Sequence, residues 1–444
     1  MTLSRRVGAK LPLFPLGTTV DADGQLRLSG LRAVDLGQQF GTPLYVYHLN
    51  TIRHQIQRYR RALAGYRGAS QLTYAGKAFL CLALARLLAD EAVGLDVCSG
   101  GEIFIARRGG VDPAQMHLHG NNKTRLDLEA ALAAGVGRIV VDNQAELDLL
   151  AHLTQGRPQP LEIWLRLTPN VAVETHHRYT VTGTADSKFG FALAEAEAIA
   201  DRLLAESSPL RLTGLHLHLG SHFHEAGPVT QALEKLLDLA ERLQHRWGWQ
   251  LQELCAGGGW GVPYQPDDPA MPVEPFIEGL VAGLERACQA RELSLPALVV
   301  EPGRSLVAQA GVALYTVGGR KVIPGVRTYV SVDGGLADNP RPALYQATYT
   351  ALLANRAAEA ETETVAIAGP YCESSDVMIQ AVTLPMARPG DLLAVPVAGA
   401  YQVSMSSNYN AALRPAVLFI DGDQVRLVQR RETFEDLIGR DQTL

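Results

Sequence analysis

Eight short apolar runs in the first three hundred residues each end in a cluster of small, polar or charged residues. Most of these runs are separated by stretches with helical spacing, such as 79–88 and 229–243. Eight alternations of strand and helix are typical of a closed parallel (β/α)8 barrel, whose functional residues lie at the carboxyl ends of its strands. The runs are 72–75, 93–97, 116–119, 139–141, 163–167, 215–219, 251–256 and 298–300.

After Arg304 the pattern becomes mostly β. We expect a second, sandwich-like or barrel-like β domain, with little helix except near 343–357. Short β-like runs at 25–28 and 43–47 are expected to pair with it. The predicted division is an N-terminal segment 1–45, a barrel 46–305 and a C-terminal β domain 306–444. Strands are predicted at 306–317, 326–332, 364–368, 392–397, 417–420 and 425–428.

Composition narrows the class of protein. With 47% hydrophobic and 19% charged residues and a net charge of −6, the 444-residue chain is typical of a globular enzyme and gives no reason to expect nucleic acid as a partner. No run is long enough to span a bilayer and no signal peptide is visible, so we expect a cytoplasmic protein without a membrane partner. The five cysteines lack the spacing of a zinc site or a disulfide framework, and no metal is expected.

Lys77 is the first candidate catalytic residue. A lysine in isolation is usually solvated. Just past the first barrel strand, however, its amine is expected to point into the barrel mouth, where partial desolvation lowers its pKa and makes it a Schiff-base nucleophile.

Backbone N–H groups of the glycine cluster 257–261 and of Gly220-Ser221 could bind a phosphate, although a tight turn needs the same residues. Together these features favour pyridoxal phosphate.

Glu301 and a pair of histidines complete the candidate cofactor site. Glu301 follows the eighth run, where a carboxylate would keep the cofactor's ring nitrogen protonated and the ring an electron sink. The alternative is a surface glutamate. His216 and His218 alternate with leucines and so share one side of the sixth strand. His218, nearer the tip, could stack on the ring, whereas a barrel-interior histidine is the structural alternative.

Many motifs occur in the order found in one enzyme family. From about residue 40 to the C-terminus the chain resembles the diaminopimelate decarboxylases, pyridoxal phosphate enzymes of fold type III, related to alanine racemase. The motifs are Tyr74-Ala75-Gly76-Lys77-Ala78, Gly120-Asn121-Asn122-Lys123, His216-Leu217-His218-Leu219-Gly220-Ser221, Gly257-Gly258-Gly259, Glu301-Pro302-Gly303-Arg304, Asp333-Gly334-Gly335, 341–345, Cys372-Glu373-Ser374, 399–410 and 430–433.

The resemblance implies a role for each matching residue. Lys77 would hold the aldehyde, and Cys372, from the neighbouring subunit of a homodimer, would be the catalytic acid. The implied cofactor-binding residues are Lys77, His218, Gly220, Ser221, Gly258, Gly259, Gly261, Glu301, Gly303 and Tyr401. The implied substrate-binding residues are Arg304, Arg341, Tyr345, Glu373 and Tyr401, with Glu373 also from the neighbouring subunit.

Two positions depart from the family pattern. His222-Phe223-His224 stands where a glutamine usually follows the Gly-Ser pair, and Ser375 replaces a usual glycine.

The resemblance implies decarboxylation of meso-2,6-diaminopimelate to L-lysine and CO2, the last step of lysine biosynthesis. The alternatives are a decarboxylase of ornithine, lysine, arginine or carboxynorspermidine, and a catalytically silent homologue that regulates a partner decarboxylase.

Overall fold

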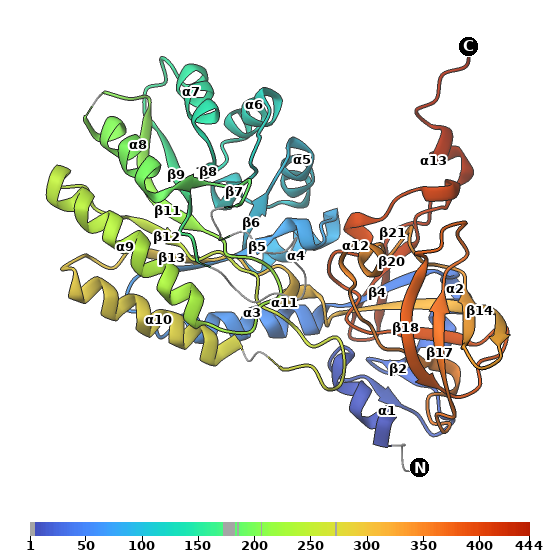
Figure 1. Ribbon diagram of the computed structural model, residues 1–444. Helices are drawn as coiled ribbons and strands as arrows, with labels where there is room; N and C mark the ends of the chain where they lie inside the picture. The colour runs from blue at the N-terminus through green and yellow to red at the C-terminus, as the bar shows by residue number, and fades with distance from the viewer. Residues whose placement is uncertain (1–4, 172–182, 184–185, 206, 271–272) are drawn as a thin grey trace. The chain divides into compact units, whose positions relative to one another are not determined.

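The first architectural unit is a closed barrel of parallel strands (Figure 1). The computed structural model describes residues 5–171, 183, 186–205, 207–270 and 273–444. The barrel closes because its last strand pairs with its first and its fourth pairs with its fifth. The predicted (β/α)8 barrel is therefore confirmed. Its strands are β5 (Ser70–Ala75), β6 (Gly94–Val97), β7 (Met116–Leu118), β8 (Arg138–Val141), β9 (Leu161–Thr168), β11 (Leu210–Leu217), β12 (Glu253–Cys255) and β13 (Ala297–Val300).

Helices alternate with these strands along the chain. Several begin at a side-chain cap: Ser99 and Asn143 accept from the backbone N–H three residues on, and Thr124 forms a capping box with Asp127. These caps fix the residue at which the loops before α5, α6 and α7 end. The helices are α3 (Leu49–Leu63), α4 (Leu82–Asp90), α5 (Gly100–Gly109), α6 (Arg125–Ala134), α7 (Gln144–Leu153), α8 (Leu193–Ala205), α9 (Gly227–Trp247) and α10 (Val273–Ala290).

The second unit is mostly β, as predicted. Its long strand β14 (Gly311–Ile323) pairs with β4 (Leu44–His48) through its first half and with β15 (Arg327–Val332) through its second. Because β4 also pairs with β20 (Ala416–Asp421), the N-terminal segment completes this sheet, which confirms that expectation. The remaining strands of the sheet are β16 (Leu352–Leu353), β17 (Glu363–Ala368), β18 (Val377–Leu384), β19 (Leu392–Val395) and β21 (Gln424–Gln429).

Smaller elements cover one side of this sheet's core. A three-stranded sheet of β1 (Thr19–Val20), β2 (Leu26–Leu28) and β3 (Leu31–Arg32) precedes α2 (Ala33–Phe40). Side chains from β2, α2, β4, β14 and β20 form one apolar cluster. The terminal helices are α1 (Arg5–Lys10) and α13 (Phe434–Ile438).

Three local predictions were wrong. The expected helix at 343–357 is limited to α12 (Arg341–Tyr345), because Gln346 has a left-handed φ of 54° that ends it. The strand expected from residue 306 begins at 311, after the short helix α11 (Arg304–Val307). Strand β18 was not predicted, because its buried and exposed residues do not alternate regularly.

By packing, the described chain divides into two units. One contains residues 1–55, 262–270 and 304–444, and the other contains 56–261 and 271–303. The domain boundaries expected at 45/46 and 305/306 stay predictions. No helix in the described part of the chain is long and apolar enough to cross a membrane.

A buried ion pair ties two barrel loops together. The Lys123 ammonium donates to Glu146 at 2.7 Å and to the backbone oxygens of Gly120 and Val140. A Lys123→Met variant is expected to lose about 3–5 kcal/mol of unfolding free energy, because the Glu146 carboxylate stays buried without its cation. Burial already raises the pKa of Glu146 to about 7. The unpaired carboxyl must bind a proton to stay buried, so the loss should be larger at pH 8 than at pH 6.

Urea unfolding at the two pH values measures this effect. Lys321→Met, at an exposed position of β14, is the matched control and should change stability little. Equal stability of Lys123→Met and the parent protein would show that the ion pair does not hold these loops.

Candidate active site

Glu301 is buried directly after β13, between two histidine rings. Its Oε1 lies 3.1 Å from Nε2 of His119 and its Oε2 lies 3.1 Å from Nε2 of His216. Burial alone would raise the pKa of Glu301, but the two histidines hold it well below its usual range. Glu301 is therefore an ionised carboxylate inside the barrel.

The two histidines differ in charge. His119 Nε2 also lies 3.5 Å from Asp96, which in turn faces His117 at 3.5 Å. Burial lowers the pKa of His119, but the two carboxylates outweigh it and raise that pKa to about 9. Burial lowers the pKa of His216 to about 4. These shifts favour the charged form of His119 and the neutral form of His216.

His218 lies two residues further along, at the carboxyl end of β11. Its Nδ1 accepts a hydrogen bond from the Gly258 N–H at 3.3 Å, which fixes the ring. Burial lowers its pKa well below the usual range, and the nearby Lys77 charge lowers it further. His218 is therefore neutral, as an acceptor Nδ1 requires.

The glycine cluster lets the loops after three adjacent strands converge. A Cβ on Gly258 would lie 2.0 Å from the backbone oxygen of Glu301, and one on Gly259 would lie 2.0 Å from that of Gly220. A side chain at either position would push these loops apart. Gly261 also links two of these loops, because its N–H donates to the backbone oxygen of Phe223.

Lys77 lies on the neighbouring strand end. It stands in the short helix η2 (Gly76–Ala78) directly after β5, which pairs with β13. The loop after Glu301 touches this end of β5, because Ala75 N–H donates to the Pro302 oxygen at 3.2 Å and Gly303 packs on Ala75. Lys77 is exposed in the described chain, and the expected partial desolvation of its amine stays a prediction. Lys77 and Glu301 therefore come from adjacent strand ends of one barrel.

The departures from the family pattern are accommodated locally. His222 has a left-handed φ of 67°, and its N–H donates to the Gly259 oxygen at 2.7 Å, next to Ser221. Ser375 donates from its backbone N–H and its hydroxyl to the Glu373 carboxylate, each at 3.1 Å, and its φ is not left-handed. No glycine is required at 375.

Two predicted substrate residues share a partner in the β unit. Arg304 and Arg341 both donate to the Tyr264 hydroxyl, at 2.6 and 3.0 Å, and Arg341 also donates to Tyr349. Burial would raise the pKa of Tyr264, but the two guanidinium groups lower it. No carboxylate of the described residues forms an ion pair with Arg341. Two cations around one phenol oxygen form a site suited to an anion.

The other predicted residues of this unit are half-buried, as Tyr345 and Tyr401 are, or exposed, as Cys372 and Glu373 are. Tyr401 has a left-handed φ of 60° and places its ring 4.9 Å from the Arg304 guanidinium. Tyr345 ends α12 and is half-buried. The Cys372 side chain is exposed, and its backbone N–H donates to Asn410 at 3.1 Å. Cys372 and Glu373 do not contact the arginine pair through any interaction that we observe in the described chain.

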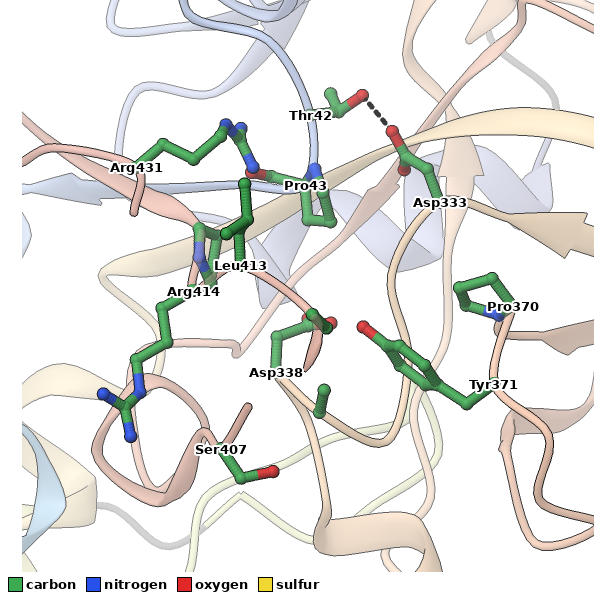
Figure 2. Close-up of a pocket in the computed structure, with 13 residues that line it drawn as sticks. Thr42, Pro43, Asp333, Asp338, Pro370, Tyr371, Ser407, Leu413, Arg414 and Arg431 are labelled. Carbon is green, nitrogen blue, oxygen red and sulfur yellow. Dashed lines mark hydrogen bonds between the residues drawn. The ribbon is translucent and has the colours of Figure 1, made fainter. Parts of the chain in front are cut away.

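A cavity of about 290 Å³ opens elsewhere in the β unit (Figure 2). Its carboxylates are already engaged: Asp333 accepts from Thr42 at 2.5 Å, and Asp338 accepts from Tyr315 at 2.6 Å. None of the residues predicted for cofactor or substrate lines it. This cavity is therefore not the candidate active site.

Sequence reasoning missed several residues that the site contains. Asp96, His119 and Tyr264 were not singled out, although His117 and His119 alternate at the end of β7 as His216 and His218 do at the end of β11, the second histidine of each pair directly following its strand. That alternation was the available signal. Asp96, His117, His119 and Glu301 are also of metal-ligand type, with ligand atoms within 4.8 Å of one another. The ion pairs already described account for their arrangement, and the absence of a metal stays a prediction.

Comparison with known proteins decides the family. Residues 49–308 match the pyridoxal binding domain of the pyridoxal-dependent decarboxylases. A diaminopimelate decarboxylase of Halalkalibacterium halodurans is 41% identical over 97% of this chain and 99% of its own length. The chain belongs to the diaminopimelate decarboxylase family.

Other members of the diaminopimelate decarboxylase family agree with this. The Bacillus subtilis enzyme is 41% identical over 94% of this chain and 95% of its own length. The crystal structure of the M. jannaschii enzyme in complex with L-lysine is 32% identical, with a TM-score of 0.88 over 96% of this chain and 98% of that one. The predicted family and its fold are confirmed.

As in the rest of the diaminopimelate decarboxylase family, the cofactor is pyridoxal phosphate, which confirms the prediction. The barrel residues fit it. Lys77 offers an accessible amine, Glu301 an ionised buried carboxylate, and the converging glycine loops a close approach of backbone N–H groups.

Proposed function

We propose that this protein decarboxylates meso-2,6-diaminopimelate to L-lysine and CO2, as the last step of lysine biosynthesis in the cytoplasm. Family membership gives the class of reaction. The observation that supports a diacid substrate is the pair Arg304 and Arg341 around Tyr264. A second carboxylate on the substrate would replace a neutral phenol as the partner of two buried cations, whereas the distal ammonium of ornithine or lysine would be repelled.

In this proposal the barrel residues bind the cofactor. When bound, pyridoxal phosphate supplies an electron sink for the electrons left on the substrate carbon after loss of CO2. In this proposal Lys77 would hold the aldehyde of the cofactor, and His218 would lie against its ring. The Glu301 carboxylate holds a proton on the ring nitrogen. Gly220, Ser221, Gly258, Gly259, Gly261 and Gly303 surround the cofactor, with Tyr401 nearby.

Residues of the β unit then act on the substrate. We propose that Cys372 gives its thiol proton to the carbon that lost CO2, and that Glu373 binds the distal ammonium. Both would come from the neighbouring subunit of an obligate homodimer. Their exposure in a single chain supports this, because residues that complete a partner's site are expected at the surface. Tyr345 would complete the substrate pocket.

A substrate panel tests the function. Purified protein loaded with pyridoxal phosphate should release CO2 from meso-diaminopimelate far faster than from lysine, ornithine, arginine or the other diaminopimelate stereoisomers. Comparable kcat/KM for ornithine and diaminopimelate would overturn the assignment. No turnover of any of these amino acids by fully loaded protein would instead favour a silent homologue.

An Arg341→Gln variant is expected to lower kcat/KM for diaminopimelate roughly tenfold to hundredfold or more, because the distal carboxylate loses a charged hydrogen-bond partner worth about 1–3 kcal/mol. Arg327→Gln, which removes an exposed arginine of β15, is the control. Equal loss of kcat/KM in both variants, or none in Arg341→Gln, would contradict the role of Arg341 in specificity.

Subunit mixing tests the shared site. Lys77→Ala and Cys372→Ala chains should each be inactive, yet an equal mixture should recover about a quarter of the parent activity, because a mixed dimer places both lesions in one site and leaves the other intact. Exchange is verified by native mass spectrometry of differently tagged chains. No recovery after complete exchange would mean that each site is built from one chain.

A further inference from the structure

The residues proposed to complete the partner's site lie on one loop of the β unit. Residues 369–376 join β17 to the antiparallel strand β18, and the Gly369 N–H closes this loop by donating to the Asp376 backbone oxygen at 3.0 Å. Cys372 and Glu373 lie in the middle of the loop and are exposed. An exposed loop is expected to be mobile unless other contacts hold its backbone.

One buried side chain supplies such contacts. Asp376 is only 5% exposed, and each of its carboxyl oxygens accepts a backbone N–H. Oδ2 accepts from Tyr371 at 2.9 Å, within the 369–376 loop, whereas Oδ1 accepts from Leu336 at 2.7 Å, in a turn that follows β15. The carboxyl group therefore ties the backbone next to Cys372 to a second segment of the β unit.

Two glycines let the backbone come this close to the carboxyl group. A Cβ on Gly369 would lie 2.3 Å from Oδ2 of Asp376, and one on Gly335 would lie 2.3 Å from Oδ1. Neither glycine has a left-handed φ, so the close approach is the reason for a glycine at both positions. This gives a physical role to Gly335 of the Asp333-Gly334-Gly335 motif.

A second contact holds the loop at Cys372 itself. The Cys372 N–H donates to Oδ1 of Asn410 at 3.1 Å, and the Tyr371 ring lies edge-on to that of Tyr409 with 6.2 Å between centroids. Asn410 is exposed, so water competes for its hydrogen bond, whereas the two bonds of Asp376 are made by a buried side chain. Asp376 is therefore the stronger of the two anchors.

We propose that Asp376 is a positioning residue that holds the loop carrying Cys372 and Glu373 in the geometry that the partner's site requires. This inference rests on the proposed roles of Cys372 and Glu373. A group that transfers a proton must be held close to the reacting atom, and a displacement of about 1 Å can cost on the order of 10²-fold in rate. Asparagine at position 376 would offer one acceptor oxygen and turn its NH2 group toward the second N–H.

Kinetics of an Asp376→Asn variant test the proposal. Its kcat for diaminopimelate should fall by about 10–100-fold in folded protein that is saturated with pyridoxal phosphate, because the loop is released on one side. Asp423→Asn makes the same chemical change in the exposed turn between β20 and β21, and this control should keep the parent kcat. A parent-like kcat in folded Asp376→Asn would overturn the inference.

Subunit mixing separates positioning of this loop from a general loss of stability. Asp376→Asn damages the same loop as Cys372→Ala does, so a mixture of these two variants should gain no activity. A mixture of Asp376→Asn with Lys77→Ala should instead recover about a quarter of the parent activity, because one site of the mixed dimer is intact. Recovery with Cys372→Ala, or none with Lys77→Ala after complete exchange, would overturn the inference.

The mixture of Lys77→Ala with Cys372→Ala distinguishes this inference from the proposed function. If that pair gains no activity after complete exchange, the shared site is wrong, and the kcat of Asp376→Asn compared with that of Asp423→Asn decides the role of Asp376 within one chain.

Two further measurements apply if Asp376→Asn does not fold. Gly369→Ala keeps the carboxyl group but forces it to move, so this variant should also lower kcat and should recover activity with Lys77→Ala only. Hydrogen exchange of the unsubstituted protein should show that the Tyr371 amide is protected, as a bond to a buried carboxyl group requires. A parent-like kcat in Gly369→Ala, or exchange at Tyr371 as fast as in an unstructured peptide, would contradict the proposal.

Discussion

A Lys77→Ala variant is expected to lose decarboxylase activity by on the order of 10³-fold or more. The Lys77 amine is proposed to bind the cofactor aldehyde, and alanine has no group that can replace it. The side chain is exposed on η2, so its removal should change the unfolding free energy little. Turnover of diaminopimelate by cofactor-saturated protein measures the loss.

The control for this variant is Lys321→Ala, which removes another exposed lysine, on β14. It should retain the parent kcat. The absorbance of the bound cofactor should change in Lys77→Ala and not in Lys321→Ala. Full turnover by a correctly folded Lys77→Ala protein would show that another amine holds the cofactor.

A Glu301→Gln variant should have a kcat lower by about 10²–10³-fold, the usual loss when one electrostatic group at a reacting centre is removed. Glutamine has the shape of glutamate, so His216 keeps a hydrogen-bond acceptor at nearly the same place. It carries no charge, however, and cannot hold a proton on the ring nitrogen. The cofactor then accepts electrons less well when CO2 leaves.

Glu278→Gln on the exposed side of α10 is the matched control, since it makes the same chemical change away from the barrel interior. Steady-state kcat at saturating substrate and cofactor is the measurement for both variants. If Glu301→Gln turned over as fast as Glu278→Gln, the ring nitrogen would not depend on this carboxylate.

The barrel could be predicted from the sequence because each strand is short, apolar and followed by a helical pattern. The same regularity predicts that Lys77 and Glu301 lie at the ends of the first and the last strand, which are neighbours in a closed barrel. The β unit is less regular, and there the sequence misled. Residues 349–354 are buried and, apart from Thr350, apolar like a helix interior, yet Gln346 ends the helix and the chain enters β16.

The site was predicted in part, because sequence order shows which residues end a strand but not which side chains meet across the barrel. His119 follows the third barrel strand and Glu301 the eighth, and the two side chains meet only inside the closed barrel. Tyr264 follows the glycine cluster in a segment that packs with the β unit, where it meets Arg304 and Arg341. Neither contact could be predicted from a local pattern in the sequence.

Borohydride trapping of the loaded protein, followed by peptide mapping, tests the central claim most directly. Reduction should fix the phosphopyridoxyl group on the peptide that contains Lys77 and abolish activity in proportion to labelling. A label on any other lysine of a fully active protein would contradict the assignment.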